Sequence, residues 1–144
     1  MDQEYVALSQ VRSRVSAVWL IGSGAIFLLL AVQCMLGKYE DKGQQVWGWV
    51  LPMIAPNFSL IFTVIRMDAL RKGKAQSVRK TFYTVALSLS VAYLVSILLT
   101  ILIEPYTPYD ALQLFELSNF WLGPFQGVVS SSLGVLYFSK RNVS

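Results

Sequence analysis

Four long runs of apolar residues alternate with short polar segments along the chain. The runs cover residues 15–36, 46–65, 81–103 and 120–138, and none of them contains Asp, Glu, Lys or Arg. A helix of about 20 residues is long enough to cross the ~30 Å hydrocarbon core of a bilayer. The pattern therefore predicts an all-α integral membrane protein, a bundle of four transmembrane helices that forms one domain over residues 1–144.

The composition agrees with this prediction. Apolar residues make up 55% of the chain and charged residues 14%, against about 45–50% and ~25% in soluble domains. The basic residues behind the net charge of +4 are gathered between the apolar runs, so we expect no direct contact with nucleic acid. Cys34 is the only cysteine, which excludes an intrachain disulfide.

The basic residues also predict an orientation. Four spans would place both termini and the segment 66–80 on one side of the membrane. That side holds Arg12, Arg14, Arg66, Arg71, Lys72, Lys74, Arg79, Lys80, Lys140 and Arg141. The other side holds only Lys38 and Lys42. Because basic residues collect on the cytoplasmic side, we expect both termini in the cytoplasm and the protein in a bacterial inner (plasma) membrane.

Most catalytic and metal sites need residue types that this chain lacks. It contains no histidine, and its apolar runs contain no titratable carboxylate or amine. We therefore predict no enzyme activity, no metal site and no cofactor. Small multidrug exporters, which also have four short spans, depend on a membrane-embedded glutamate that is missing here.

The second run contains two prolines followed by an amide. Pro52 and Pro56 each lack an N–H, so we expect this helix to be kinked. Asn57 lies near the middle of the run, where an amide facing lipid is unfavourable, so it should point into the bundle. Its candidate partners are a carbonyl freed by a proline and the side chains of Ser88, Ser96, Gln126 and Ser130. Two interpretations remain open: a structural kink, or a gate whose amide contacts an ion or solute.

Small and hydroxyl-bearing residues recur every fourth position in the third and fourth runs. In the third run the row is Thr84, Ser88, Ala92, Ser96 and Thr100. In the fourth run it is Gly123, Gly127, then Ser130 or Ser131, and Gly134. Such rows let helix backbones approach closely. They predict either packing of these two spans within one chain, or an oligomer interface or narrow polar pathway.

The segment 66–80 carries six basic residues that we expect to contact either anionic lipid or a cytoplasmic protein partner. They are Arg66, Arg71, Lys72, Lys74, Arg79 and Lys80. We expect this segment to extend the second and third runs as helix, with a turn at Gly73.

Three functions follow as hypotheses. The first is a homo-oligomeric channel or pore-type protein whose polar pathway includes Asn57, Ser88, Ser96, Thr100, Gln126 and Ser130. The second is a membrane sensor or anchor that recruits a cytoplasmic partner through the segment 66–80, for example in a bacterial defence system. The third is a lipid or small-solute carrier. Membrane lipids and further copies of the chain are the expected partners.

Overall fold

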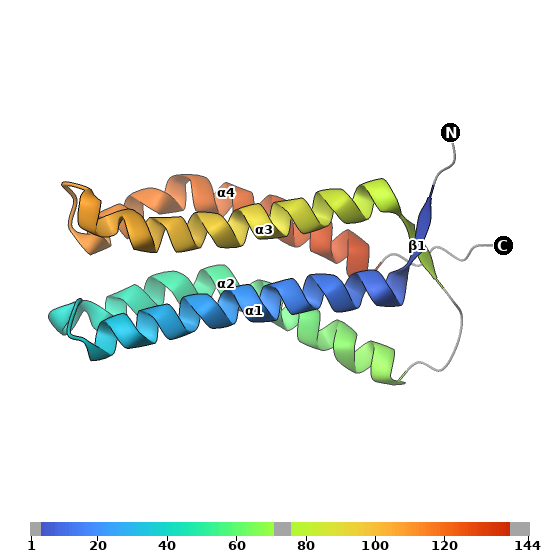
Figure 1. Ribbon diagram of the computed structural model, residues 1–144, viewed down its shortest axis with the longest axis horizontal. Helices are drawn as coiled ribbons and strands as arrows, with labels where there is room; N and C mark the ends of the chain where they lie inside the picture. Colours follow the sequence, from blue (N-terminus) through green and yellow to red (C-terminus); the bar gives the residue numbers. More distant parts are fainter. Residues whose placement is uncertain (1–3, 71–75, 139–144) are drawn as a thin grey trace.

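Four long helices make up almost all of the molecule (Figure 1). The computed structural model describes residues 4–70 and 76–138. Its helices are α1 (Leu8–Met35), α2 (Gly43–Leu70), α3 (Lys80–Ile103) and α4 (Ala111–Phe138). At ~1.5 Å per residue such helices are roughly 36–42 Å long. The predicted all-α class is confirmed, and α1, α2 and α3 are each long and apolar enough to cross a membrane.

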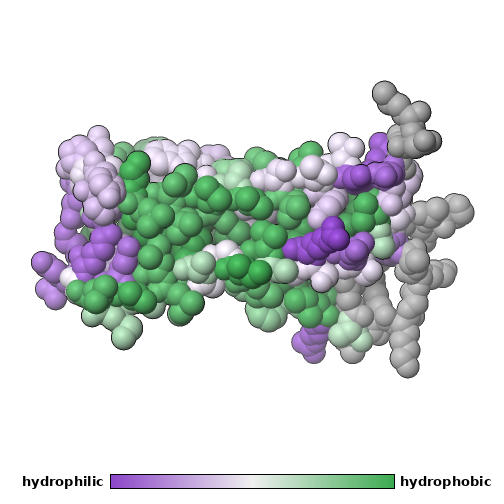
Figure 2. Space-filling view, viewed as in Figure 1, coloured by the Kyte–Doolittle hydropathy of each residue, from purple (hydrophilic) through white to green (hydrophobic). Residues whose placement is uncertain are grey.

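Apolar side chains cover the outside of the bundle as well as its inside. Ile21 on α1 is 73% exposed, Phe62 on α2 is 61% exposed, and Phe120 on α4 is 79% exposed. Figure 2 shows the resulting apolar band between two hydrophilic ends. So much exposed apolar surface is unusual for a protein in water, whereas lipid chains surround it readily. The surface is consistent with a membrane protein.

The helices do not pack in the order in which they follow one another in the chain. α3 contacts both α1 and α4, and α4 also contacts α2, whereas α1 and α2 contact each other much less than any of these pairs. Figure 1 shows the C-terminal part of α2 leaving the bundle toward the end where α1 begins. Pro52 and Pro56 lie inside α2, which continues as one helix through both.

Aromatic residues fill the places where the helices meet. Trp19 of α1 and Tyr93 of α3 are fully buried, with ring centroids 6.1 Å apart. Tyr93 also meets Phe125 of α4 edge to face at 5.5 Å. Closer to the short loops, Trp49 of α2 stacks on Phe115 of α4 at 4.3 Å. The centre of a single copy is therefore occupied by side chains.

A two-stranded ribbon, which the sequence pattern does not predict, lies at the end where α1 and α3 begin. β1 (Tyr5–Ala7) pairs antiparallel with β2 (Ser77–Arg79). Backbone hydrogen bonds extend the pairing from the Leu8 N–H to the Gln76 oxygen (2.8 Å) and from the Lys80 N–H to the Glu4 oxygen (3.0 Å). The ribbon thus ties the start of α1 to the start of α3.

The ribbon corrects the expectation for the segment 66–80. The second run does continue as helix, since α2 reaches Leu70. The third does not, because the backbone groups of β2 pair with β1 and α3 begins only at Lys80. The turn expected at Gly73 lies outside the described residues.

Two short 3-10 turns connect the helices at the opposite end, η1 (Glu40–Lys42) and η2 (Glu104–Tyr106). The fourth helix starts well before the apolar run predicted for it, at residue 111 instead of 120. Its first turn closes when the Leu114 N–H donates to the Asp110 carbonyl at 3.0 Å. The segment 111–119 is helical although Gln113, Glu116 and Asn119 interrupt its apolar pattern, which explains the difference.

Candidate functional site

Pro56 removes one backbone hydrogen bond from α2 near the middle of the bundle. In a regular helix the N–H of residue 56 would donate to the carbonyl oxygen of Pro52, four residues earlier, but proline has no N–H. The side chain of Gln126 on α4 supplies the missing donor, with its Nε2 at 3.0 Å from the Pro52 oxygen. Gln126, predicted as a pathway residue, thus completes the hydrogen bonding of a neighbouring helix.

Asn57 follows Pro56 and is completely buried. Its Oδ1 accepts a hydrogen bond of 2.8 Å from the Ser130 hydroxyl of α4. Its Nδ2 is also buried and has no hydrogen-bond partner within residues 4–70 and 76–138. The structure therefore places the amide inside the bundle, with Ser130 as its partner and one amide NH₂ group unpaired.

Tyr93 completes a mid-bundle polar cluster, which we define as Pro52, Asn57, Tyr93, Gln126 and Ser130. The Tyr93 hydroxyl donates to the carbonyl oxygen of Met53 at 3.3 Å. Sequence reasoning missed Tyr93, because an aromatic residue in an apolar run is typical of core packing. The hydroxyl itself was the available signal, since a buried tyrosine usually needs a hydrogen-bond partner.

The mid-bundle polar cluster has hydrogen-bonding groups but no charge. Amides do not titrate near neutral pH, and the cluster contains no carboxylate, thiol or amine. Its one titratable group is the Tyr93 phenol, whose hydroxyl is already engaged with the Met53 carbonyl oxygen. It can hold the proline-containing helix against α3 and α4, and it can offer one further donor through Asn57.

The hydroxyl row of α3 is separate from this cluster. Thr84, Ser88 and Ala92 are exposed, whereas Thr100 is buried. The hydroxyls of Thr84, Ser96 and Thr100 donate to carbonyl oxygens one turn earlier on α3, at 2.7–3.0 Å. Hydroxyls in helices commonly bond in this way. Among the described side chains, neither Ser88 nor Ser96 bonds to Asn57.

The glycines of α4 are not held between α3 and α4. Gly123 and Gly127 are exposed. A Cβ added at Gly123, Gly127 or Gly134 would meet no atom of the described chain within 4 Å. Ser131, one turn after Gly127, is exposed and donates to the Gly127 oxygen at 2.8 Å. The row Gly123, Gly127 and Ser131 therefore faces outward, and Ser130 beside it faces Asn57.

Half of the basic residues predicted to contact lipid or a partner are described. Arg66 near the end of α2 and Arg79 on β2 are exposed. Lys80 forms an ion pair with Glu4. The hydrogen bond that the Lys80 amine donates to the Glu4 carboxylate lowers the pKa of Glu4. The remaining three, Arg71, Lys72 and Lys74, lie outside the described residues.

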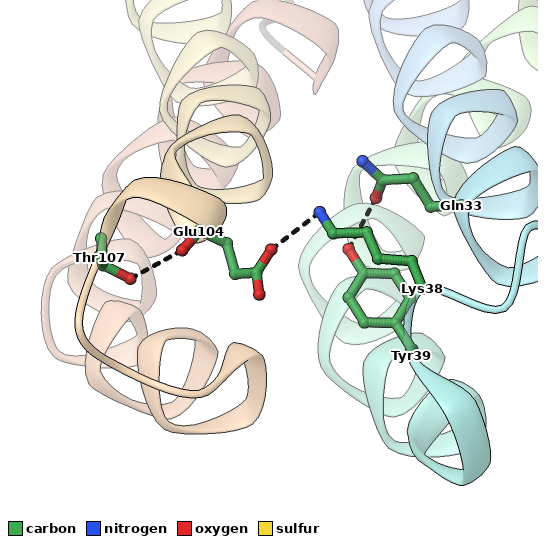
Figure 3. Close-up of polar contacts among 5 residues, drawn as sticks. All are labelled: Gln33, Lys38, Tyr39, Glu104 and Thr107. Atoms are coloured by element: carbon green, nitrogen blue, oxygen red, sulfur yellow. Dashed lines mark hydrogen bonds and ion pairs between the residues drawn. The ribbon is translucent and has the colours of Figure 1, made fainter.

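A network of polar contacts joins the two short loops at the opposite end (Figure 3). Lys38 pairs with Glu104 at 2.8 Å, and the Tyr39 hydroxyl donates to Gln33 at 2.7 Å. Thr107 donates to the Glu104 carbonyl at 2.9 Å. Burial raises the pKa of the Tyr39 phenol, with a smaller contribution from the Glu104 carboxylate. Sequence reasoning missed this network, although opposite charges in the two outer loops were a usable signal.

The predicted site residues that the structure describes thus lie mainly in three places: the mid-bundle polar cluster, the rows of α3 and α4, and the basic end of the bundle. Within the described chain, no group of three His, Cys, Asp or Glu residues is placed to hold a metal ion. No family model matches the chain, and no characterised protein or solved structure matches it either.

Proposed function

We propose that the protein crosses the membrane four times, with both termini in the cytoplasm, and acts as a homo-oligomer of the channel or pore type. The length of α4 supports the fourth crossing, since α4 has 28 residues, the same number as α1 and α2. α4 also packs alongside α2 and α3, and it exposes Phe120, Val128 and Val135. These residues suit a lipid environment.

The described charges support the proposed orientation. One end of the bundle carries Arg12, Arg14, Arg66, Arg79 and Lys80. The end with the loops η1 and η2 carries Lys38 and Lys42, each paired with a carboxylate. A concentration of basic residues at one end favours placing that end in the cytoplasm.

The outward-facing glycine row of α4 carries the oligomer proposal. In lipid, helices gain little from the hydrophobic effect and associate through close backbone approach at small residues. Gly123 and Gly127 offer such a surface, and no described part of the same chain covers it. Val128 and Phe120 beside them are 54% and 79% exposed. A second copy can pack its own α4 against this row.

A conducting path would lie between copies rather than through one. The centre of a single copy holds Trp19, Tyr93 and other large side chains. The row of Thr84, Ser88 and Ala92 on α3 faces outward, so assembled copies could turn it toward a shared space. Hydroxyl-bearing surfaces of this kind can line narrow polar pathways.

Gly127→Leu tests the proposal. A Cβ added at Gly127 meets no described atom within 4 Å apart from its own helix backbone and chain neighbours, so each copy should still fold, whereas the contact between copies should be blocked. We expect the unmodified protein to form a defined oligomer by native mass spectrometry in lipid nanodiscs and to give ion flux in liposomes. Gly127→Leu should lower the oligomeric state and remove the flux.

Gly48→Leu is the matched control, because Gly48 of α2 has equally open surroundings and lies outside the row. It should keep both the mass and the flux. Ser88→Leu should keep the oligomer and change the flux. A monomeric unmodified protein without flux would overturn the proposal.

A cytoplasmic anchor is the second candidate, favoured by one observation. Arg66 and Arg79 are exposed at the end where the ribbon ties α1 to α3, so the basic segment starts and finishes on a fixed surface. The triple change Arg71→Glu, Lys72→Glu and Lys74→Glu separates the candidates, once the topology has been checked. It should leave channel flux intact, whereas it should abolish recruitment if the protein is an anchor.

A further inference from the structure

A groove of about 640 Å³ runs between α1 and α2. It exists because these two helices contact each other only sparsely and because the C-terminal part of α2 leaves the bundle (Figure 1). Small-molecule sites commonly have volumes of ~300–1,000 Å³. The groove is therefore large enough to hold part of a ligand.

The wall of the groove is apolar and continues into the outer surface of the bundle. Leu20, Leu28, Leu51 and Phe62 line it, and each is also 43–65% exposed. Ser59, a hydroxyl in the wall, donates to a carbonyl of its own helix at 3.1 Å. The groove thus opens sideways into whatever surrounds the apolar band, which is lipid if the bundle spans a membrane.

The two ends of the groove differ. Toward the short loops, the rings of Phe27 and Trp47 approach to 4.9 Å and narrow it. At the other end lies Phe62, and Arg66 follows one helical turn later on the same side of α2. Arg66 is exposed. A cation therefore lies just beyond the open end of an apolar groove.

We propose that the groove holds an acyl chain of an anionic lipid whose phosphate binds Arg66. Lipid tails are as apolar as the groove, so the hydrophobic effect does not favour one lipid over another. Selection falls to the headgroup, where a guanidinium can donate two parallel hydrogen bonds to a phosphate. The proposal rests on the proposed membrane span and is independent of the channel.

Quenching of Trp47 fluorescence tests the site, because Trp47 lines the groove. The full chain carrying Trp121→Phe removes an indole that is 52% exposed, while Trp19 and Trp49 are buried. It is reconstituted in vesicles that contain phosphatidylglycerol or phosphatidylcholine with brominated acyl chains. We expect stronger quenching by the anionic lipid at the same mole fraction.

Arg66→Gln should lower this preference about fivefold, as expected for one basic residue at a charged membrane surface. Arg79→Gln is the matched control, because it removes the same charge at the same end from β2, away from the groove. It should keep most of the preference. Equal quenching by both lipids in the unmodified protein would overturn the proposal.

Gly24→Leu should fill the groove, since a Cβ at this lining residue meets no described atom within 4 Å. Quenching by both lipids should fall, whereas Val91→Leu on the exposed side of α3 should leave it unchanged. Helix content from circular dichroism checks that both variants fold. If Gly24→Leu lowers the oligomer mass and leaves the quenching unchanged, a second copy occupies the groove and the proposal is wrong.

Ser23→Val distinguishes a lipid tail from a polar occupant. Ser23 lines the groove and is 2% exposed, and its hydroxyl has no partner among the described residues. An acyl chain at this depth has no acceptor for the hydroxyl, so the change should leave lipid quenching intact. Loss of quenching would show that the occupant bonds to Ser23 and would overturn the proposal.

Discussion

Pro56 and Gln126 are linked through one backbone hydrogen-bonding site although they lie on different helices. The proline leaves the Pro52 carbonyl without its backbone donor, and the glutamine amide donates to it. An unpaired buried polar group costs about 1–3 kcal/mol, although interhelical hydrogen bonds in membranes average nearer ~0.6 kcal/mol. The pair therefore explains why α2 accommodates a proline here without a break.

Gln126→Leu should lower the free energy of unfolding by about 1 kcal/mol, because the Pro52 oxygen then lacks a donor. In a Pro56→Ala background residue 56 regains its N–H and can bond to that oxygen, so the same change should cost less. Unfolding in mixed detergent micelles gives the four values of this double-mutant cycle. Additive effects would contradict the pairing.

At the level of single elements, the loop residue Asp110 stabilises the start of α4, which lies before the predicted apolar run. Asp110 stands directly before α4, and its carboxylate accepts a hydrogen bond from Lys42 at 2.7 Å. That bond, with smaller contributions from the N–H groups of Ala111 and Leu112, lowers the pKa of Asp110. A carboxylate at a helix N-terminus is also favoured by the helix dipole.

This lowered pKa predicts a pH dependence. The stability that Asp110 contributes is fully present above its ordinary value of 3.8 and is lost as the pH falls through the lowered value. Asp110→Asn removes the charge. In a series of thermal unfolding measurements, the melting temperature of the unmodified protein should fall over this acid range, whereas that of Asp110→Asn should fall less. The same dependence on pH in both proteins would refute the assignment.

At the level of the whole molecule, the two ends of the bundle are held together differently. One end uses the ribbon β1–β2 and a hydrogen bond between Ser16 and Tyr137 at 2.9 Å. The other end uses two ion pairs, Lys42–Asp110 and Lys38–Glu104, the second of which is drawn in Figure 3. The Lys38 and Glu104 side chains are only 27% and 16% exposed, so their pair is less screened by water than a surface pair.

Reversing either charge of this pair should destabilise the bundle by about 1–2 kcal/mol, between the values for exposed and buried pairs. Lys38→Glu brings two carboxylates together, and Glu104→Lys brings two amines together. The double variant restores opposite charges and should recover a large part of the loss in a thermal unfolding assay. A double variant less stable than both single variants would argue against direct pairing.

The four long helices, and the inward direction of Asn57, could be predicted from the sequence alone. Both follow from the surroundings rather than from particular neighbours. In lipid every backbone group must be paired within the chain, so an apolar run of sufficient length predicts a helix whatever packs against it. For the same reason an amide at mid-depth must turn away from lipid, and Ser130 was among its predicted partners.

The rotation of each helix about its axis depended on packing. The helices are apolar on nearly all sides, so the usual signal of one polar face is weak. Small residues at spacing four suit a neighbour from the same chain or from another copy, and only the structure places Gly127 outward. The β1–β2 ribbon joins residues 70–74 positions apart, so no local pattern could indicate it. The groove between α1 and α2 likewise arises from the packing of the helices, because α1 packs mainly on α3 and α2 mainly on α4, so α1 and α2 contact each other only sparsely.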